Sequence, residues 1–211
     1  MAPRYSVILA DPPWAYGSRS THKKTKFGGG VHGHYPVMST PDICALPIGR
    51  DYADSNCALF LWATGPHLKS GIEVIEAWGF RFITVAFSWI KTTKDGSKPK
   101  FGPGYYTASN LEPVLLGVRG RMKPANNDVP QVVLEPHPRG EDGRIIHSRK
   151  PVEVHRRIER LFGDVPRLEI FARVPEPGWD VIGNQLADGA TQLHPQRNLF
   201  DWSGQPMPTG A

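Results

Sequence analysis

The chain has 211 residues, a net charge of +5 at pH 7 and two cysteines. This length is typical of one domain with a sizeable core, and the modest positive charge suits a polyanionic partner. No apolar run approaches the length of a membrane-spanning helix, and the N-terminal residues do not resemble a signal peptide. Cys44 and Cys57 stand in no metal-ligand spacing, so we predict no metal site and expect reduced thiols in a cytoplasmic protein.

The apolar run at residues 5–10 (YSVILA) predicts a buried strand, and Asp11-Pro12-Pro13-Trp14 follows it directly. Ligand sites of open α/β sheets lie at the carboxyl ends of strands, so this turn is the first candidate for chemistry. The prolines fix φ and remove two backbone donors, and we expect the Pro12 carbonyl and the Asp11 carboxylate to stand side by side as acceptors for a base amine. An exposed Trp14 would offer a face for base stacking, worth about 1–3 kcal/mol per base.

Two fixed acceptors would favour a pyramidal exocyclic amine and expose its lone pair to an electrophilic methyl group. Asp11 is therefore the candidate catalytic residue, supported by Pro12, Pro13 and Trp14. Asp-Pro-Pro is also an ordinary strand-ending turn, and Trp14 could instead cap the core. These four residues alone do not decide between the chemical and the structural interpretation.

The rest of the chain predicts an alternation of strands and helices. Residues 17–34 are rich in lysine and glycine and show no apolar periodicity, so that a lid over the substrate and a plain surface loop both fit. Strands that alternate with helices in this way predict an α/β fold. We expect, in order, a helix over 40–47, a strand over 57–63, a helix over 67–78, strands over 80–90, over 112–118 and near 132–134, a helix over 150–163 and a strand over 167–172.

The loop at residues 91–110 combines cations with aromatic rings. Cations that contact phosphates, next to rings that stack on bases, are what single-stranded or flipped nucleotides require. A solvated hairpin with aromatic packing at its base is the alternative. We take Lys91 and Tyr105 as candidate substrate contacts. The full set is Lys91, Lys94, Lys98, Lys100, Phe101, Tyr105 and Tyr106.

The helix over 150–163 has an apolar inner stripe and an arginine-rich outer face. A cation at the start of a helix opposes the helix dipole, so Lys150 is a candidate for holding an anion. The arginine face is typical of a solvated surface, with a phosphate-binding stripe as the alternative. The predicted inner residues are Val154, Ile158 and Leu161, and the predicted outward residues are Arg156, Arg157 and Arg160.

No G-x-G-x-x-G turn follows the strand at 167–172, so the usual dinucleotide fingerprint is absent. The end of a strand is still a suitable place for a cofactor, and Asn184 and Gln185 carry the donors and acceptors that a ribose needs. The segment from residue 187 onward is rich in glycine, proline and polar residues. We therefore expect one folded domain over 1–186 and a loosely ordered tail over 187–211.

With the strand before it, the Asp11-Pro12-Pro13-Trp14 turn resembles the signature of the MT-A70 family of adenine-N6 methyltransferases. Further similarities follow in the same order, and together they cover residues 5–186. Any single one is weak, whereas the turn and the seven later stretches, eight in sequence, are specific. They are HYPVMS at 34–39, LFLWATG at 59–65, WIKT at 89–92, EPVLLGVRG at 112–120, HSRKP at 147–151, LEIFAR at 168–173, and GW at 178–179 with GNQL at 183–186.

The resemblance implies a Rossmann-like methyltransferase fold that uses S-adenosylmethionine. Its order is permuted, with the catalytic strand first and the main cofactor strand late. The resemblance also implies that Lys150 grips the carboxylate of the methionine part and that Tyr35 and Trp14 line the pocket for the target base. The residues that it assigns to the cofactor are Asp11, Lys150, Arg173, Asn184 and Gln185.

We therefore predict a compact, site-specific methyltransferase of bacterial or phage type that methylates adenine N6 in nucleic acid, with DNA preferred to RNA. RNA N6-adenosine methylation, an inactive nucleic-acid-binding subunit of the same fold and cytosine N4 methylation are the alternatives. The recognition sequence and strand state stay open, because specificity depends on loop contacts. The oligomeric state also stays open, with a homodimer as one option.

Overall fold

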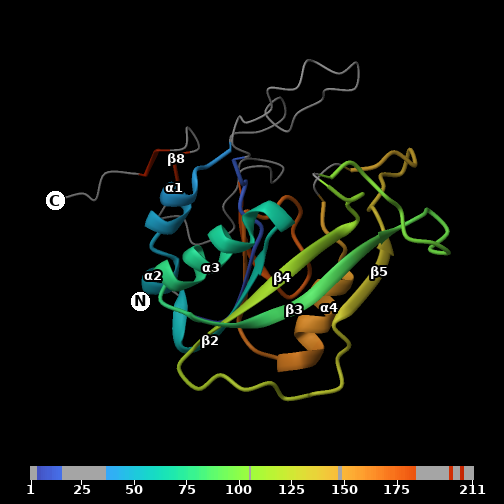
Figure 1. Cartoon of the computed structure of the whole chain (residues 1–211). Coiled ribbons are helices and arrows are strands. Elements are labelled where there is room, and N and C mark those ends of the chain that lie inside the picture. The colour runs from blue at the N-terminus through green and yellow to red at the C-terminus, as the bar shows by residue number, and fades with distance from the viewer. Residues whose placement is uncertain are drawn as a thin grey trace.

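The structure is a computed structural model that describes residues 4–15, 37–104, 106–146 and 149–183, and the backbone of residues 200–201 and 205–206. A seven-stranded sheet forms its centre, in the order β5-β3-β4-β2-β1-β6-β7 (Figure 1). Its strands are β1 (Tyr5–Ala10), β2 (Ala53–Trp62), β3 (Arg81–Thr92), β4 (Leu111–Arg119), β5 (Val132–Pro136), β6 (Arg167–Ile170) and β7 (Asp180–Ile182). The helices are α1 (Thr40–Ala45), α2 (Ile48–Asp51), the 3₁₀ helix η2 (Gly65–His67), α3 (Leu68–Ala77) and α4 (Glu153–Phe162), and β8 (Phe200–Asp201) pairs with β9 (Gln205–Pro206).

The first strand of the chain lies inside the sheet. β1 pairs in parallel with β2 on one side and with β6 on the other, and β6 pairs in parallel with β7. β4 is antiparallel to both β2 and β3, so the sheet is mixed. This order agrees with the predicted permuted arrangement, in which the strand that leads into Asp11 comes first in the chain. In the sheet that strand is central, and the late strand β6 lies beside it.

Helices cover both faces of the sheet (Figure 1). One hydrophobic cluster joins β1, β2 and β6 to α1, α2 and α3, and Ile43, Ile48 and Ile75 are fully buried in it. The other cluster joins the opposite face to α4 through Val154 and Ile158. Because β1 is covered on both sides, it has no polar face, which explains the continuous apolar sequence of residues 7–10.

The predicted elements are all present, with shifted boundaries. The two strands around the 93–110 loop are longer than predicted, and α3 ends just before Gly79, whose φ is +82°. The prediction that a helix opens at Lys150 is wrong, because α4 begins at Glu153. Lys150 thus precedes the first turn of the helix, and the helix dipole gives no reason to assign it to an anion.

The prediction that Arg157 faces outward is also wrong. Its side chain is 14% exposed and pairs with Glu153 at 2.9 Å. Its guanidinium also donates to the carbonyl of Pro130 at 2.5 Å and to that of Val132 at 2.7 Å. Arg157 therefore ties α4 to the start of β5, a role that helical periodicity does not reveal because the acceptors are backbone atoms.

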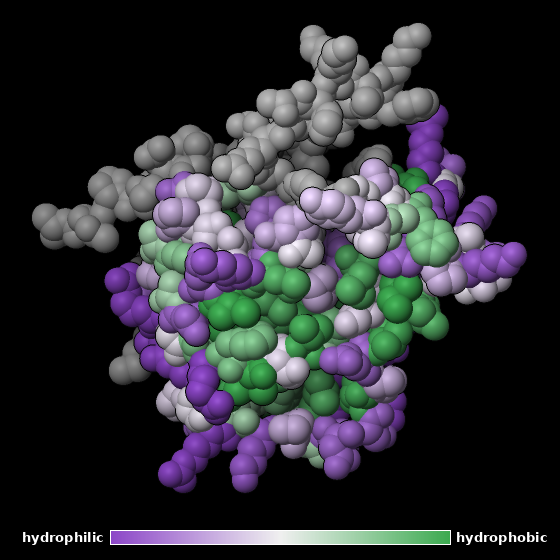
Figure 2. Space-filling model, viewed as in Figure 1, coloured by the Kyte–Doolittle hydropathy of each residue, from purple (hydrophilic) through white to green (hydrophobic). Residues whose placement is uncertain are grey.

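Apolar side chains gather over β3, β4 and β5 on the face shown in Figure 2. Large exposed hydrophobic residues of these strands are Ile83, Leu111, Val132 and Leu134. Within the described part of the chain, the helices are too short or too polar to cross a lipid bilayer.

Candidate active site

The turn after β1 places Asp11 at the carboxyl edge of the sheet, between the ends of β2 and β6. The backbone N–H of Asp11 donates to the carbonyl of Ile170 at 3.3 Å, which extends the pairing of β1 with β6 by one residue. The N–H of Trp14 donates back to the Pro12 carbonyl at 2.9 Å. The Pro12 carbonyl is thus fixed by one hydrogen bond and keeps a second lone pair for another donor.

The indole of Trp14 is buried, contrary to the prediction of an exposed stacking face. Trp14 is 6% exposed, its Nε1–H donates to the carbonyl of Trp62 at 3.1 Å, and its ring stacks on His67 at 5.3 Å. The N–H of Met38 holds the turn from outside by donating to the Pro13 carbonyl at 2.8 Å. The turn folds Trp14 against the end of β2, which lies next to β1, and its role in binding a base stays a prediction.

Lys150 joins two acidic residues at this edge. Its Nζ lies 2.9 Å from Oδ1 and 2.7 Å from Oδ2 of Asp11, and 3.6 Å from Oε2 of Glu112. Lys91 forms an ion pair with the same Glu112. The four side chains are each less than a quarter exposed, so two buried acids share two buried cations in a chain of ion pairs. Lys150 also lies over the Trp62 ring, with Nζ 5.3 Å from its centroid.

The network shifts the pKa values of its members in opposite directions. Burial raises the pKa of Asp11, and the opposing pull of Lys150 does not cancel that effect. For Glu112 burial also raises the pKa, but Lys150 and Lys91 outweigh it, and its pKa is lowered. Burial lowers the pKa of Lys150, but Asp11 and Glu112 more than offset this, and its pKa is raised. Lys150 is therefore held as a cation between two carboxyl groups of unequal proton affinity.

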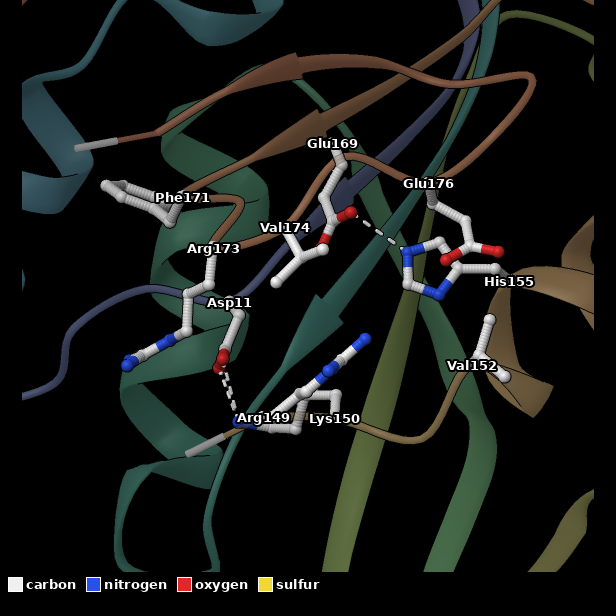
Figure 3. Close-up of a pocket in the computed structure, with 10 residues that line it drawn as sticks. All are labelled: Asp11, Arg149, Lys150, Val152, His155, Glu169, Phe171, Arg173, Val174 and Glu176. Atoms are coloured by element: carbon white, nitrogen blue, oxygen red, sulfur yellow. Dashed lines mark hydrogen bonds and ion pairs between the residues drawn. The ribbon is translucent and has the colours of Figure 1, made fainter. Parts of the chain in front are cut away.

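A pocket opens next to Asp11 and Lys150 (Figure 3). Its volume, including the mouth, is about 470 Å³, within the range of small-molecule sites. Basic and acidic side chains alternate around an otherwise apolar wall. The lining residues are Asp11, Arg149, Lys150, Val152, His155, Glu169, Phe171, Arg173, Val174 and Glu176.

His155 and Glu169 are pocket residues that sequence reasoning missed. The Nε2 atom of His155 lies 2.9 Å from Oε2 of Glu169, and the imidazole meets the ring of Trp179 edge-on at 5.0 Å. His155 is 7% exposed. The signal in the sequence is weak, because a histidine between Val154 and Ile158 on the inner face of a helix is more often a core residue than a site residue.

The backbone at the end of β6 is strained and tightly packed. Phe171 has a φ of +65°, which is rare for a residue with a side chain and costs about 1–3 kcal/mol. Gly183 follows β7 and approaches Ala172 so closely that a Cβ would lie 1.8 Å from the Ala172 carbonyl oxygen. Strain of this kind persists where the surroundings enforce it, and here it lies in a wall of the pocket.

The structure brings together three of the predicted cofactor residues, since Asp11, Lys150 and Arg173 line one pocket. It places Lys91 against Glu112, where β3 leads into the lysine-rich loop at residues 93–110. In that loop Phe101 and Tyr106 are exposed. The other predicted site residues, Tyr35, Tyr105, Asn184 and Gln185, lie outside the described residues.

The chain is similar to known methyltransferases. It is 32% identical over 209 residues to the type II methyltransferase M.MunI of a Mycoplasma species, a match that covers 93% of this chain and 84% of that protein. It is 27% identical over 186 residues to an N(6)-adenosine-methyltransferase MT-A70-like protein of Arabidopsis thaliana, and 27% identical over 195 residues to the human N(6)-adenosine-methyltransferase catalytic subunit METTL3. These two matches cover 86% and 91% of this chain but 24% and 30% of the longer relatives.

The MT-A70 family model matches residues 5–185. This range runs from β1 past β7, and it includes all the residues that line the pocket. The sheet order, with the strand before Asp11 at its centre, agrees with the match. The chain therefore belongs to the MT-A70 family of S-adenosylmethionine-dependent adenine-N6 methyltransferases.

Proposed function

We propose that this chain methylates N6 of adenine in DNA, with Asp11 as the catalytic residue. The observation that carries the proposal is the position of Asp11, which ends the central strand, lines the pocket and is paired with Lys150. The family match supports the reaction class, and the buried ion pairs support a site whose charges are set before any ligand binds.

The pocket fits S-adenosylmethionine by the chemistry of its side chains. Arg149, Lys150 and Arg173 suit a carboxylate, and Glu169 and Glu176 suit ammonium and hydroxyl groups. We assign the methionine carboxylate to Lys150 and Arg173, and the ribose to Asn184 and Gln185. When bound, S-adenosylmethionine supplies an electrophilic methyl group.

Asp11 has two tasks in the proposed reaction. Its carboxylate and the free lone pair of the Pro12 carbonyl accept hydrogen bonds from the two N–H groups of the target amine, which frees the nitrogen lone pair for attack. Lys150 contacts both carboxylate oxygens, and each oxygen keeps a further lone pair for an incoming amine. Glu112 lies 3.6 Å from the same lysine. The raised pKa of Asp11 also makes it a better acceptor for the proton that the amine loses.

The choice of DNA rests on the bacterial relative. The type II methyltransferase is matched over 84% of its length, whereas the adenosine methyltransferases are matched over 24–30% of theirs. RNA is the alternative, because adenosine is the ribonucleoside. Exposed Phe101 and Tyr106 beside the lysines of the 93–110 loop support contact with a polynucleotide of either kind. A cytoplasmic setting, a homodimer and the domain boundary at residue 186 stay predictions.

The test is methyl transfer from labelled S-adenosylmethionine to single- and double-stranded DNA and RNA, followed by digestion to nucleosides and mass spectrometry. We expect N6-methyldeoxyadenosine from DNA and a loss of at least about 100-fold in rate for Asp11→Asn. Asp164→Asn is the matched control, because that carboxylate is fully exposed. Methylated adenosine in RNA alone would support the alternative polymer. No product on any polymer, from folded protein that binds S-adenosylmethionine, would support the inactive-subunit hypothesis.

A further inference from the structure

His155 forms part of the pocket wall opposite Arg173. It lies in the first turn of α4, is more than nine-tenths buried and lines the pocket together with Lys150 and Glu169. Figure 3 shows its ring on the same side of the pocket as Glu169 and Glu176, away from the side chain of Arg173. The imidazole and the two glutamates thus form one side of the pocket, across from Asp11 and Arg173.

The hydrogen bond to Glu169 determines which nitrogen of His155 carries hydrogen. A carboxylate only accepts, so the Nε2 atom at 2.9 Å from Glu169 must be the N–H donor. In the neutral imidazole Nδ1 then has a lone pair and no hydrogen. The edge-on contact with Trp179, whose Nε1–H donates to Glu159 at 2.8 Å, limits rotation of the ring.

Nδ1 of His155 is buried and has no hydrogen-bond partner among the residues that the structure describes. Buried polar atoms are nearly always paired, so an acceptor that is fixed in place and unpaired inside a pocket points to a partner supplied by a ligand. That ligand group must be a donor of N–H or O–H. It must also lie close to the place where Lys150 would hold a carboxylate, since both residues line one pocket.

We propose that Nδ1 of His155 accepts a hydrogen bond from the ammonium group of the methionine part of S-adenosylmethionine. The inference rests on the proposed function and assigns a binding residue within the same pocket. An amino acid carries its carboxylate and its ammonium on one carbon, so a site for it needs cations and acceptors a few ångströms apart. Arg149, Lys150 and Arg173 supply the first, and His155 with Glu169 supplies the second.

Two substitutions separate the two nitrogens of His155. In His155→Gln the side-chain amide can still donate to Glu169 from about the position of Nε2, but the acceptor at Nδ1 is lost. In His155→Asn the shorter side chain keeps a carbonyl oxygen near the position of Nδ1 and loses the bond to Glu169. A residue that only braces α4 against β6 would tolerate the first change better than the second, whereas a ligand-binding residue would show the reverse.

The experiment is calorimetric titration with S-adenosylhomocysteine and with its desamino analogue, which keeps the carboxylate and lacks the ammonium group. We expect His155→Gln to bind S-adenosylhomocysteine about tenfold more weakly than the unchanged protein and to bind the desamino analogue equally well. In His155→Asn the ratio of the affinities for S-adenosylhomocysteine and its desamino analogue should be unchanged. This ratio can still be measured if one variant loses some stability.

Equal weakening of both ligands in His155→Gln, or no weakening of either, would overturn the inference and leave the proposed function intact. If the unchanged protein binds neither ligand, the proposed function fails together with the inference. Thermal unfolding of each variant identifies protein that has not folded. If His155→Gln does not fold, an unchanged affinity of His155→Asn for S-adenosylhomocysteine supports the inference, and a weakened one overturns it.

Discussion

The ammonium group of Lys150 lies within 2.9 Å of both carboxylate oxygens of Asp11, although 139 residues separate the two in the chain. This ion pair connects the turn after the first strand to the segment that leads into α4. It holds the Asp11 carboxylate in one orientation at the carboxyl edge of the sheet. Since Glu112 shares the same ammonium group at 3.6 Å, the protonation of Asp11 depends on a residue that need not touch the substrate.

The first prediction concerns the pH dependence of methyl transfer. Asp11 must be ionised to accept hydrogen bonds from the amine, and its pKa is raised above the ordinary 3.8. The rate should therefore fall as the pH is lowered through this raised value. Glu112→Gln removes a negative charge that raises the pKa of Asp11, so the acid limb should move to lower pH.

The measurement is the pH profile of kcat/KM for the two proteins. Glu73→Gln is the control, because Glu73 is half-exposed and lies in a surface pair with Lys69 at 3.9 Å. An acid limb that stays in place in Glu112→Gln would contradict the assignment of that limb to Asp11.

The second prediction separates the structural role of Trp14 from a stacking role. Trp14→Phe removes the N–H that bonds the Trp62 carbonyl at 3.1 Å, so a buried acceptor loses its partner. The free energy of unfolding should drop by about 1–3 kcal/mol, with the KM for DNA unchanged. Tyr106→Ala should do the opposite, because that ring is fully exposed in the basic loop. Urea unfolding and steady-state kinetics measure both effects. An unchanged stability with a raised KM for DNA in Trp14→Phe would support base stacking by Trp14 instead.

The third prediction concerns the close approach of Gly183 to β6. A Cβ at this position would lie 1.8 Å from the Ala172 carbonyl oxygen, a backbone atom that cannot rotate away. Gly183→Ala should therefore lower the free energy of unfolding by about 1–3 kcal/mol or more. Gly65→Ala is the matched control, because nothing lies within 4 Å of the added carbon. Equal midpoints of urea unfolding for the two variants would show that the backbone around Ala172 moves to accept the added carbon with no loss of stability.

The fourth prediction compares two neighbouring arginines of α4. Arg157→Ala leaves the carbonyls of Pro130 and Val132 without this donor and should cost about 1–3 kcal/mol of stability. Arg156→Ala, at an exposed position, should change the stability by less than about 0.5 kcal/mol. Thermal unfolding of the pair checks this, and a larger loss for Arg156→Ala would contradict the contacts of α4.

Some features of the protein follow from local sequence. The apolar run at 5–10 predicted β1, because a strand covered on both faces needs no polar residues. The helical spacing before Gly79 predicted α3, and Asp11-Pro12-Pro13-Trp14 with the later motifs indicated the family. These signals depend on neighbours along the chain, and the sheet order and the family match confirm what they implied.

Other features depend on which distant segments meet, and only the tertiary structure decided them. The insertion of β1 between β2 and β6 brings Asp11 to Lys150 and folds Trp14 against Trp62, and the packing of α4 on β6 places His155 against Glu169. No pattern of spacing along the chain predicts these contacts, because each contact joins residues from different elements. The sequence by itself determined the elements and the types of reactive side chain, whereas the packing of β1 inside the sheet decided which charges form ion pairs and which rings are buried.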